Sequence, residues 1–247
     1  AGTRAYDGTT SAAGSILTAS NLVAGDTLTF TGSGALASAN AGGQTITSFA
    51  GLIPSNTNYM VTGASGTVAI LPAALTVSTG NVSKTYDGTL GMTGAMGQGA
   101  MVTGGTLYTN VSNGNALDSV SGGTFAFTNA NAGSGNKAVT TSGVTVTDGN
   151  SGGNYKVTYA NNTTSTINPA TLSVALIGPV TKAYDGTPAA PLNTANFTLS
   201  GFLGSESASV TQTAGTYAST NAGAGINVSS TLANGNYSAG AGTLLSN

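Results

Sequence analysis

Apolar and polar residues alternate with a period of two in several parts of the chain. In Thr27–Thr31, Leu28 and Phe30 fall on one side and three threonines fall on the other, and segments 124–128 and 144–147 follow the same pattern. Successive side chains of a strand point to opposite faces, so this alternation predicts half-buried β-strands. Glycine interrupts almost every window of ten residues, and no oppositely charged pair is spaced four residues apart. Both features disfavour helices, and we therefore predict an all-β chain.

A short motif recurs three times between these alternating segments. It consists of a base, a spacer, tyrosine, aspartate, glycine and threonine, and its tyrosines lie 80 and then 98 residues apart. Self-similarity at such a spacing is typical of repeated modules. The motif residues that we select as the structural repeat motif are Arg4, Tyr6, Asp7 and Gly8; Lys84, Tyr86, Asp87 and Gly88; and Lys182, Tyr184, Asp185 and Gly186.

Two further landmarks follow each motif in a fixed order, and a third landmark follows them after the first two motifs. Asn-Ala-Gly occurs at 40–42, 131–133 and 221–223, Asn-Tyr at 58–59, 154–155 and 236–237, and Pro-Ala-x-Leu-x-Val at 72–77 and 169–174. Proline restricts a linker, and the Leu/Val strand after it is expected to open the next sheet. We therefore predict three modules, 1–72, 73–170 and 171–247, of which the first lacks its opening strand and comes from a longer array.

The module length limits the architecture. Modules of about 80–100 residues with short strands match an immunoglobulin-like β-sandwich, whereas one solenoid coil needs only about 20–30 residues. A tandem array of sandwiches is therefore preferred, with a β-solenoid as the alternative. The second module is longer than the first, and its Met- and Gly-rich segment 91–105 is either a short helix or an insertion loop.

Composition removes several classes of function. Only 5% of the residues are charged and the net charge is −2, which leaves no electrostatic footprint for nucleic acid. The mean hydropathy of +0.14 argues against disorder, which combines low hydrophobicity with high net charge. The longest apolar run, Val68–Val77, is interrupted by Pro72 and Thr76 and is too short to insert in a membrane.

Catalysis and metal binding are disfavoured by the residue types. The chain has no histidine and no cysteine, so the usual triads, thiol nucleophiles and zinc sites are excluded. Ser83 and Lys84 are adjacent and point to opposite faces of a strand, and the seven carboxylates are scattered. The loop 148–154 is rich in oxygen atoms but has one carboxylate, where a calcium site has several. We predict no enzyme activity, no cofactor and no metal.

The Tyr-Asp-Gly motif has two interpretations. Asp-Gly is a turn signal, and the base and tyrosine lie on one strand face, where they could contact a carbohydrate or a peptide. Alternatively, the motif forms a corner in which tyrosine packs and its hydroxyl caps a backbone group. Since all copies share folding rather than one ligand, its recurrence favours the structural interpretation.

The landmarks together resemble the YDG-type repeat domains of large bacterial surface proteins, over essentially the whole chain. Such domains accompany Gly/Thr-rich modules in filamentous-haemagglutinin-like adhesins exported by two-partner secretion. The resemblance implies secretion, location at the cell surface or in the extracellular matrix of a Gram-negative bacterium, and a role as a stalk or in adhesion, as in a biofilm. It implies no catalytic residue.

Two functions from different classes follow. The first is a non-catalytic stalk segment of a secreted adhesin or matrix fibre, whose partners are neighbouring modules or like chains and which could self-associate into filaments. The second is a binding module whose grooves between modules contact a host or matrix glycan or protein. Aromatic side chains buried in each module would favour the stalk, and aromatic side chains clustered on one exposed face would favour binding.

Overall fold

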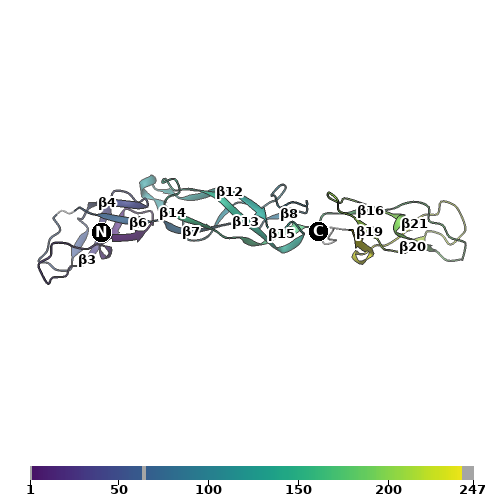
Figure 1. Cartoon of the computed structure of the whole chain (residues 1–247), viewed down its shortest axis with the longest axis horizontal. Helices are drawn as coiled ribbons and strands as arrows, with labels where there is room; N and C mark the ends of the chain where they lie inside the picture. Colours follow the sequence, from purple (N-terminus) through teal and green to yellow (C-terminus); the bar gives the residue numbers. More distant parts are fainter. Residues whose placement is uncertain (1, 63–64, 241–247) are drawn as a thin grey trace. The chain divides into compact units, whose positions relative to one another are not determined.

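The computed structural model describes residues 2–62 and 65–240 (Figure 1). These residues form short β-strands joined by turns and 3-10 helices, with no α-helix among them. The all-β prediction is confirmed. The described chain divides into two compact units, and the division passes through the second predicted module instead of following the repeats. The three module boundaries therefore stay a prediction.

The first unit comprises 2–62, 65–81, 97–126 and 139–162. Its largest sheet has the order β1-β6-β4-β3-β2, with β5 paired to β3, and a second sheet has the order β14-β7-β9. β10 and β11 form a hairpin. The strands are β1 (Gly2–Ala5), β2 (Ser11–Ala13), β3 (Phe30–Leu36), β4 (Gly42–Ser48), β5 (Leu52–Pro54), β6 (Thr67–Leu71), β7 (Ala73–Thr79), β9 (Ala100–Gly104), β10 (Thr109–Asn110), β11 (Ala116–Leu117) and β14 (Tyr155–Tyr159), and the 3-10 helices are η1 (Gly14–Ile16) and η2 (Val111–Asn113).

The second unit comprises 82–96, 127–138 and 163–240 of the described chain. β8 and β15 belong to a sheet with the order β12-β13-β15-β8, and the remaining strands pair as β16-β18, β17-β20-β21 and β19-β22. The strands that lie wholly in this unit are β8 (Ser83–Thr85), β16 (Ser173–Leu176), β17 (Ala189–Pro191), β18 (Phe197–Ser200), β19 (Ala208–Val210), β20 (Ala214–Tyr217), β21 (Val228–Ser229) and β22 (Tyr237–Ala239), and the 3-10 helices are η3 (Thr194–Asn196) and η4 (Asn234–Asn236). Three strands have residues in both units: β12 (Ser119–Phe127), β13 (Gly133–Thr147) and β15 (Asn162–Asn168).

The strand after the first Pro-Ala begins as predicted. β7 starts at Ala73, directly after Pro72, and buries Ala73, Leu75 and Val77 on one face. It pairs in parallel with β14 and antiparallel with β9. Parallel pairs also join β1 to β6 and β8 to β15. The sheets that contain β6 and β7 hold antiparallel pairs as well and are therefore mixed.

Two local predictions need correction. Residues 27–29 alternate as a strand would, but β3 begins only at Phe30, because alternation selects a face and pairing also requires a neighbouring strand in register. For segment 91–105 the helix alternative is wrong. The loop alternative holds for 91–99, apart from a bridge between Met96 and Ser83, whereas β9 occupies 100–104. By contrast, segment 144–147 lies in β13 as predicted, and segment 124–128 lies in β12 except for its last residue, Thr128.

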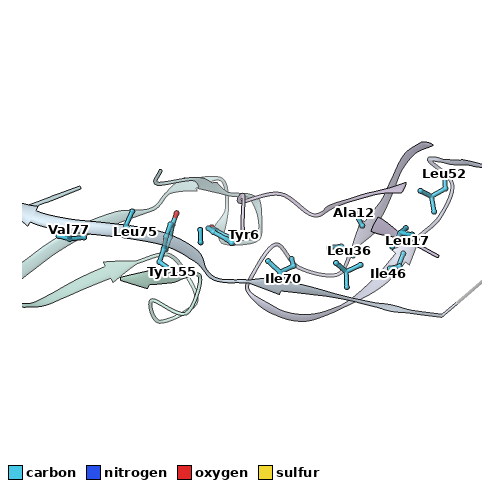
Figure 2. Packing of buried hydrophobic residues seen from close by; sticks show 12 residues of the cluster. Tyr6, Ala12, Leu17, Leu36, Ile46, Leu52, Ile70, Leu75, Val77 and Tyr155 are labelled. Carbon is cyan, nitrogen blue, oxygen red and sulfur yellow. The ribbon is translucent and has the colours of Figure 1, made fainter. Parts of the chain in front are cut away.

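Each unit has its own apolar core. In the first unit the core runs from Leu52 and Leu36 to Tyr6, Tyr155 and Val77. Figure 2 shows Tyr6 and Tyr155 next to each other within this core, with Ile70 on one side and Leu75 on the other. In the second unit the core includes Leu192, Phe197 and Val210. The tyrosine pair belongs to two different repeats of the sequence, and it leads directly to the candidate site.

Candidate functional site: tyrosine–carboxylate junctions

The three Tyr-Asp-Gly motifs form the same turn. In each, one aspartate oxygen accepts hydrogen bonds from the backbone N–H and the hydroxyl of the following threonine, at 2.8–2.9 Å. The base donates to the same aspartate oxygen, at 2.5 Å in the first motif and 2.7 Å in the others. It also donates to the threonine carbonyl. The threonine is therefore part of the motif, in addition to the residues selected from the sequence.

The glycine of each motif has a left-handed backbone. Its φ is +78° at Gly8, +73° at Gly88 and +75° at Gly186. Glycine reaches this region without steric cost. At Gly8 a side chain would also collide, since an added Cβ would lie 2.2 Å from the Thr109 carbonyl oxygen.

The basic residues of the turns differ in burial. Lys84 is only 3% exposed. Its ammonium group also donates to the Gly91 carbonyl at 2.9 Å and lies 5.5 Å from the centre of the Phe127 ring. Burial opposes ionisation of Asp87, but the hydrogen bonds from Lys84 and Thr89 outweigh it and lower the pKa of that carboxyl. In the third turn, the hydrogen bond from Lys182, with those from Thr187, lowers the pKa of Asp185 to about 2.

The tyrosine of the first motif is bound by a carboxylate of the second repeat. The Tyr6 hydroxyl donates to Asp118 Oδ2 at 2.7 Å, and the Tyr155 hydroxyl donates to the same oxygen at 2.7 Å. The Tyr6 ring meets Tyr155 and Tyr108 edge to face, with centroid separations of 5.3 and 5.7 Å. Tyr6 and Asp118 are both 1% exposed. Burial, followed by the bond to Asp118, raises the pKa of Tyr6 far above its usual value.

Asp118 is held by a short backbone arrangement that we call the acid turn. The Asp118 N–H donates to the Tyr108 carbonyl at 2.9 Å, and the Tyr108 N–H donates to the Tyr155 hydroxyl at 2.9 Å. The Tyr155 hydroxyl in turn donates to Asp118, which closes a ring of hydrogen bonds. Burial and the Asp118 bond raise the pKa of Tyr155, although the bond from the Tyr108 N–H acts in the opposite direction.

The first repeat contains the same ring. The Asp26 N–H donates to the Val23 carbonyl at 2.9 Å, and the Val23 N–H donates to the Tyr59 hydroxyl at 3.0 Å. The Tyr59 hydroxyl donates to Asp26 Oδ2 at 2.6 Å, and this bond raises the pKa of Tyr59. We therefore assign residues 23–26 as the first acid turn and 108–118 as the second, which contains the additional β10–β11 hairpin.

The third acid turn comprises residues 203–206. The Glu206 N–H donates to the Leu203 carbonyl at 3.1 Å, and the Leu203 N–H donates to Glu206 Oε2 at 3.4 Å. Glu206 Oε1 accepts a short hydrogen bond from the hydroxyl of Tyr86, the tyrosine of the second motif. The motif tyrosines of the first and second repeats are thus each bound by the acid turn of the repeat that follows.

Sequence reasoning missed the acid turns. In the sequence, Asp26, Asp118 and Glu206 are scattered carboxylates that differ in residue type and in distance from the preceding motif. One signal was present in the sequence: each repeat has one acidic residue between its Tyr-Asp-Gly and its Asn-Ala-Gly.

The asparagine landmarks also meet across repeats. Asn40 Oδ1 accepts from the side chains of Asn110 at 2.9 Å and Asn154 at 3.2 Å. Asn154 Oδ1 accepts from the Ala41 N–H at 2.8 Å. Asp148 lies in the oxygen-rich loop 148–154. Its carboxylate accepts hydrogen bonds from three backbone N–H groups of that loop, each at 2.8 Å. Its carboxylate therefore has a structural role, and residues 2–62 and 65–240 contain no cluster of acidic residues that could hold a metal ion.

The fold and these junctions define a class: an all-β repeat protein whose repeats share one turn and one tyrosine–carboxylate contact. The YDG domain family model matches residues 1–67, 71–164 and 168–243. The chain belongs to the YDG domain family, as its resemblance to YDG-type repeats predicted. No curated protein and no solved structure matches it. Among the described residues, none lies in a helix of the length and apolarity needed to cross a membrane.

Proposed function

We propose that this chain is a non-catalytic structural segment of a secreted bacterial adhesin or extracellular matrix fibre. The observation that carries the proposal is the repeated junction: Tyr6 is bound by Asp118, and Tyr86 is bound by Glu206. A contact between a motif tyrosine and a carboxylate at successive repeats holds neighbouring repeats in register. This is what a stalk requires and what a lone catalytic or binding site does not.

The distribution of aromatic side chains supports the stalk over the binding module. Of the nine tyrosines and six phenylalanines, all within the described residues, Tyr159 and Tyr184 are the two that are largely exposed. The others are buried or half-buried. Ligand-binding faces for glycans or proteins usually present several aromatic rings together, so the aromatic rings of this chain serve packing.

The amino-acid composition is suited to a protein outside the cell. Five Lys and Arg residues in 247 leave few cleavage sites for proteases of trypsin-like specificity. Three of these five, Arg4, Lys84 and Lys182, form ion pairs with the aspartates of the turns. The absence of cysteine leaves the fold independent of the redox state of its surroundings.

Small-angle X-ray scattering tests the stalk role. We compare the wild-type chain, at concentrations where it is monomeric, with a variant carrying Tyr6→Phe and Tyr86→Phe. Because each substitution removes one charge-assisted hydrogen bond at a junction, we expect the distance distribution to broaden in the variant. Tyr159→Phe, which alters an exposed tyrosine outside the junctions, is the matched control. Identical distributions for all three proteins would contradict the proposal.

Two further measurements test the extracellular location and the alternative function as a binding module. An antiserum raised against the chain should label intact cells or the extracellular matrix of the producing bacterium, and labelling only after lysis would exclude secretion. A glycan array should give no signal above background. Micromolar binding to one glycan that survives the double substitution would favour the binding module.

A further inference from the structure

One Tyr-Asp-Gly turn and one acid turn lack the partners that the others have. Tyr184 sits in a turn with the same hydrogen bonds as the first two. Its side chain is nevertheless 70% exposed, and its hydroxyl has no hydrogen-bond partner within 2–62 and 65–240. Tyr6, in the equivalent position, is buried against Asp118 and Tyr155.

The first acid turn is the complementary case. Asp26 accepts from Tyr59 as Asp118 accepts from Tyr155, but no motif tyrosine of the described chain contacts Asp26. Asp118 Oδ2 accepts two hydroxyls at once, so a carboxylate in this ring has capacity for a second donor. The Asp26–Tyr59 bond lies in solvent-exposed surroundings.

A cavity of about 390 Å³ lies beside Tyr59 of the first acid turn. Its lining is mixed: it includes apolar and aromatic residues such as Phe30, Tyr59 and Met60 and polar residues such as Thr18, Ser20 and Asn21. Met60 is 80% exposed. At the second acid turn, the equivalent tyrosine, Tyr155, packs edge to face against the incoming Tyr6. The first acid turn therefore offers a carboxylate and a tyrosine ring beside a cavity, and Tyr184 offers an exposed ring with a free hydroxyl.

We propose that a second copy of this chain occupies the first acid turn. Tyr184 of one copy packs against Tyr59 of the next, and its hydroxyl donates to Asp26 as that of Tyr6 donates to Asp118. The inference rests on the proposed function, because it extends the junction within the chain to a junction between chains. The two surfaces differ, so the contact is heterologous, and copies joined in this way form open filaments unless a ring closes.

The association should require high protein concentration. Within one chain, a junction is favoured by the covalent link, which gives an effective concentration in the millimolar range. Two separate chains lack this link. We therefore expect oligomers to appear only as the protein approaches millimolar concentrations, and each added copy to lengthen the assembly.

Cross-linking between single cysteines tests the direction of assembly. The chain has no native cysteine, so Ala24→Cys in the first acid turn and Ala183→Cys beside Tyr184 each supply one thiol, and both positions are exposed. With a short bismaleimide, a mixture of the two variants should give at least about fivefold more cross-linked dimer than either variant alone. Equal yields from the mixture and from either single variant would overturn the head-to-tail contact, as would the absence of dimers near millimolar protein.

The hydroxyl of Tyr184 provides a second readout. Adding Tyr184→Phe to the Ala183→Cys variant removes one hydrogen bond to a carboxylate and should lower the yield of mixed dimer about tenfold. Asp26→Asn in the Ala24→Cys variant should also lower it, whereas the control Tyr159→Phe should leave it unchanged. An unchanged yield with Tyr184→Phe would overturn the assigned contact. If the cross-linking fails while the scattering of the junction variants behaves as expected, the stalk role stands and only the contact between chains is lost.

Discussion

Tyr6 and Tyr184 occupy the same position in nearly identical turns, yet one is 1% exposed and the other 70%. In both turns the aspartate binds the threonine and the base in the same way. The difference lies outside the turn, because Tyr6 has the acid turn of the next repeat against it. The comparison separates two levels of structure: neighbouring residues build the turn, and a distant carboxylate decides the environment of its tyrosine.

The largest expected loss of stability follows from substitution of Asp118, the carboxylate against which Tyr6 is buried. Asp118→Ala leaves the hydroxyls of Tyr6 and Tyr155 buried without their charged acceptor, and each such bond contributes about 1.5–3 kcal/mol. We expect the free energy of unfolding to fall by about 3 kcal/mol, because removal of a buried carboxylate partly offsets the loss. Urea denaturation followed by tyrosine fluorescence measures it, since the chain has no tryptophan.

Asp26→Ala is the matched control for this substitution. Asp26 holds the same ring of bonds in an exposed setting, and exposed substitutions usually change stability by about 0.5 kcal/mol or less. Equal losses for the two variants would show that burial by the preceding tyrosine does not distinguish the two acid turns.

The bases of the turns allow the next comparison. Lys84 is buried and donates to Asp87 and to two backbone carbonyls. Lys84→Met should cost about 2–3 kcal/mol, because the carbonyls of Thr89 and Gly91 lose their donor and the carboxylate of Asp87 loses its counter-ion. In the third turn, Asp185 lies at the surface, so Lys182→Met should cost less than about 1 kcal/mol. Denaturation of both variants in parallel tests the order, and a larger loss for Lys182→Met would contradict it.

Removal of single tyrosine hydroxyls gives a smaller effect. Tyr6→Phe keeps the ring in the core and removes one bond to Asp118, which retains the bond from Tyr155. We expect a loss of about 1–2 kcal/mol. Tyr184→Phe should change the stability of the monomer by less than about 0.5 kcal/mol. Thermal unfolding at low protein concentration measures both, and a loss at Tyr184 comparable to that at Tyr6 would reveal a partner for Tyr184 within the chain.

Alkaline pH gives an effect at the lower end of that expected for loss of the Tyr6 hydroxyl. The pKa of Tyr6 and of Tyr155 is raised in the folded state, so both stay protonated after the unfolded chain begins to ionise near pH 10. Their contribution is complete below pH 10 and is lost as the pH rises towards the folded pKa. Between pH 10 and 11 the wild type should lose about 1 kcal/mol more than Tyr6→Phe. Unfolding midpoints at the two pH values measure it, and equal losses would mean that Tyr6 ionises in the fold as it does when unfolded.

The local parts of the fold were accessible from the sequence. Alternation at 124–128 and 144–147 predicted residues that lie in strands except for Thr128, and the motif with its Asp-Gly step predicted turns in which each glycine has a positive φ. The same reasoning failed at 27–29, where alternation is present and a pairing strand is not. Side-chain order along a strand is a property of neighbouring residues, whereas pairing depends on a segment elsewhere in the chain.

The amino-acid order alone specified the repeats, the β-strands and the Tyr-Asp-Gly turn, because each depends on residues a few positions apart. Only the tertiary structure decided which carboxylate each tyrosine meets. Asp118 and Glu206 differ in type, and the β10–β11 hairpin lies within the second acid turn but not in the other two. Since no constant spacing or residue type marks these acids, their role emerged only when folding brought residues more than one hundred positions apart within hydrogen-bond distance.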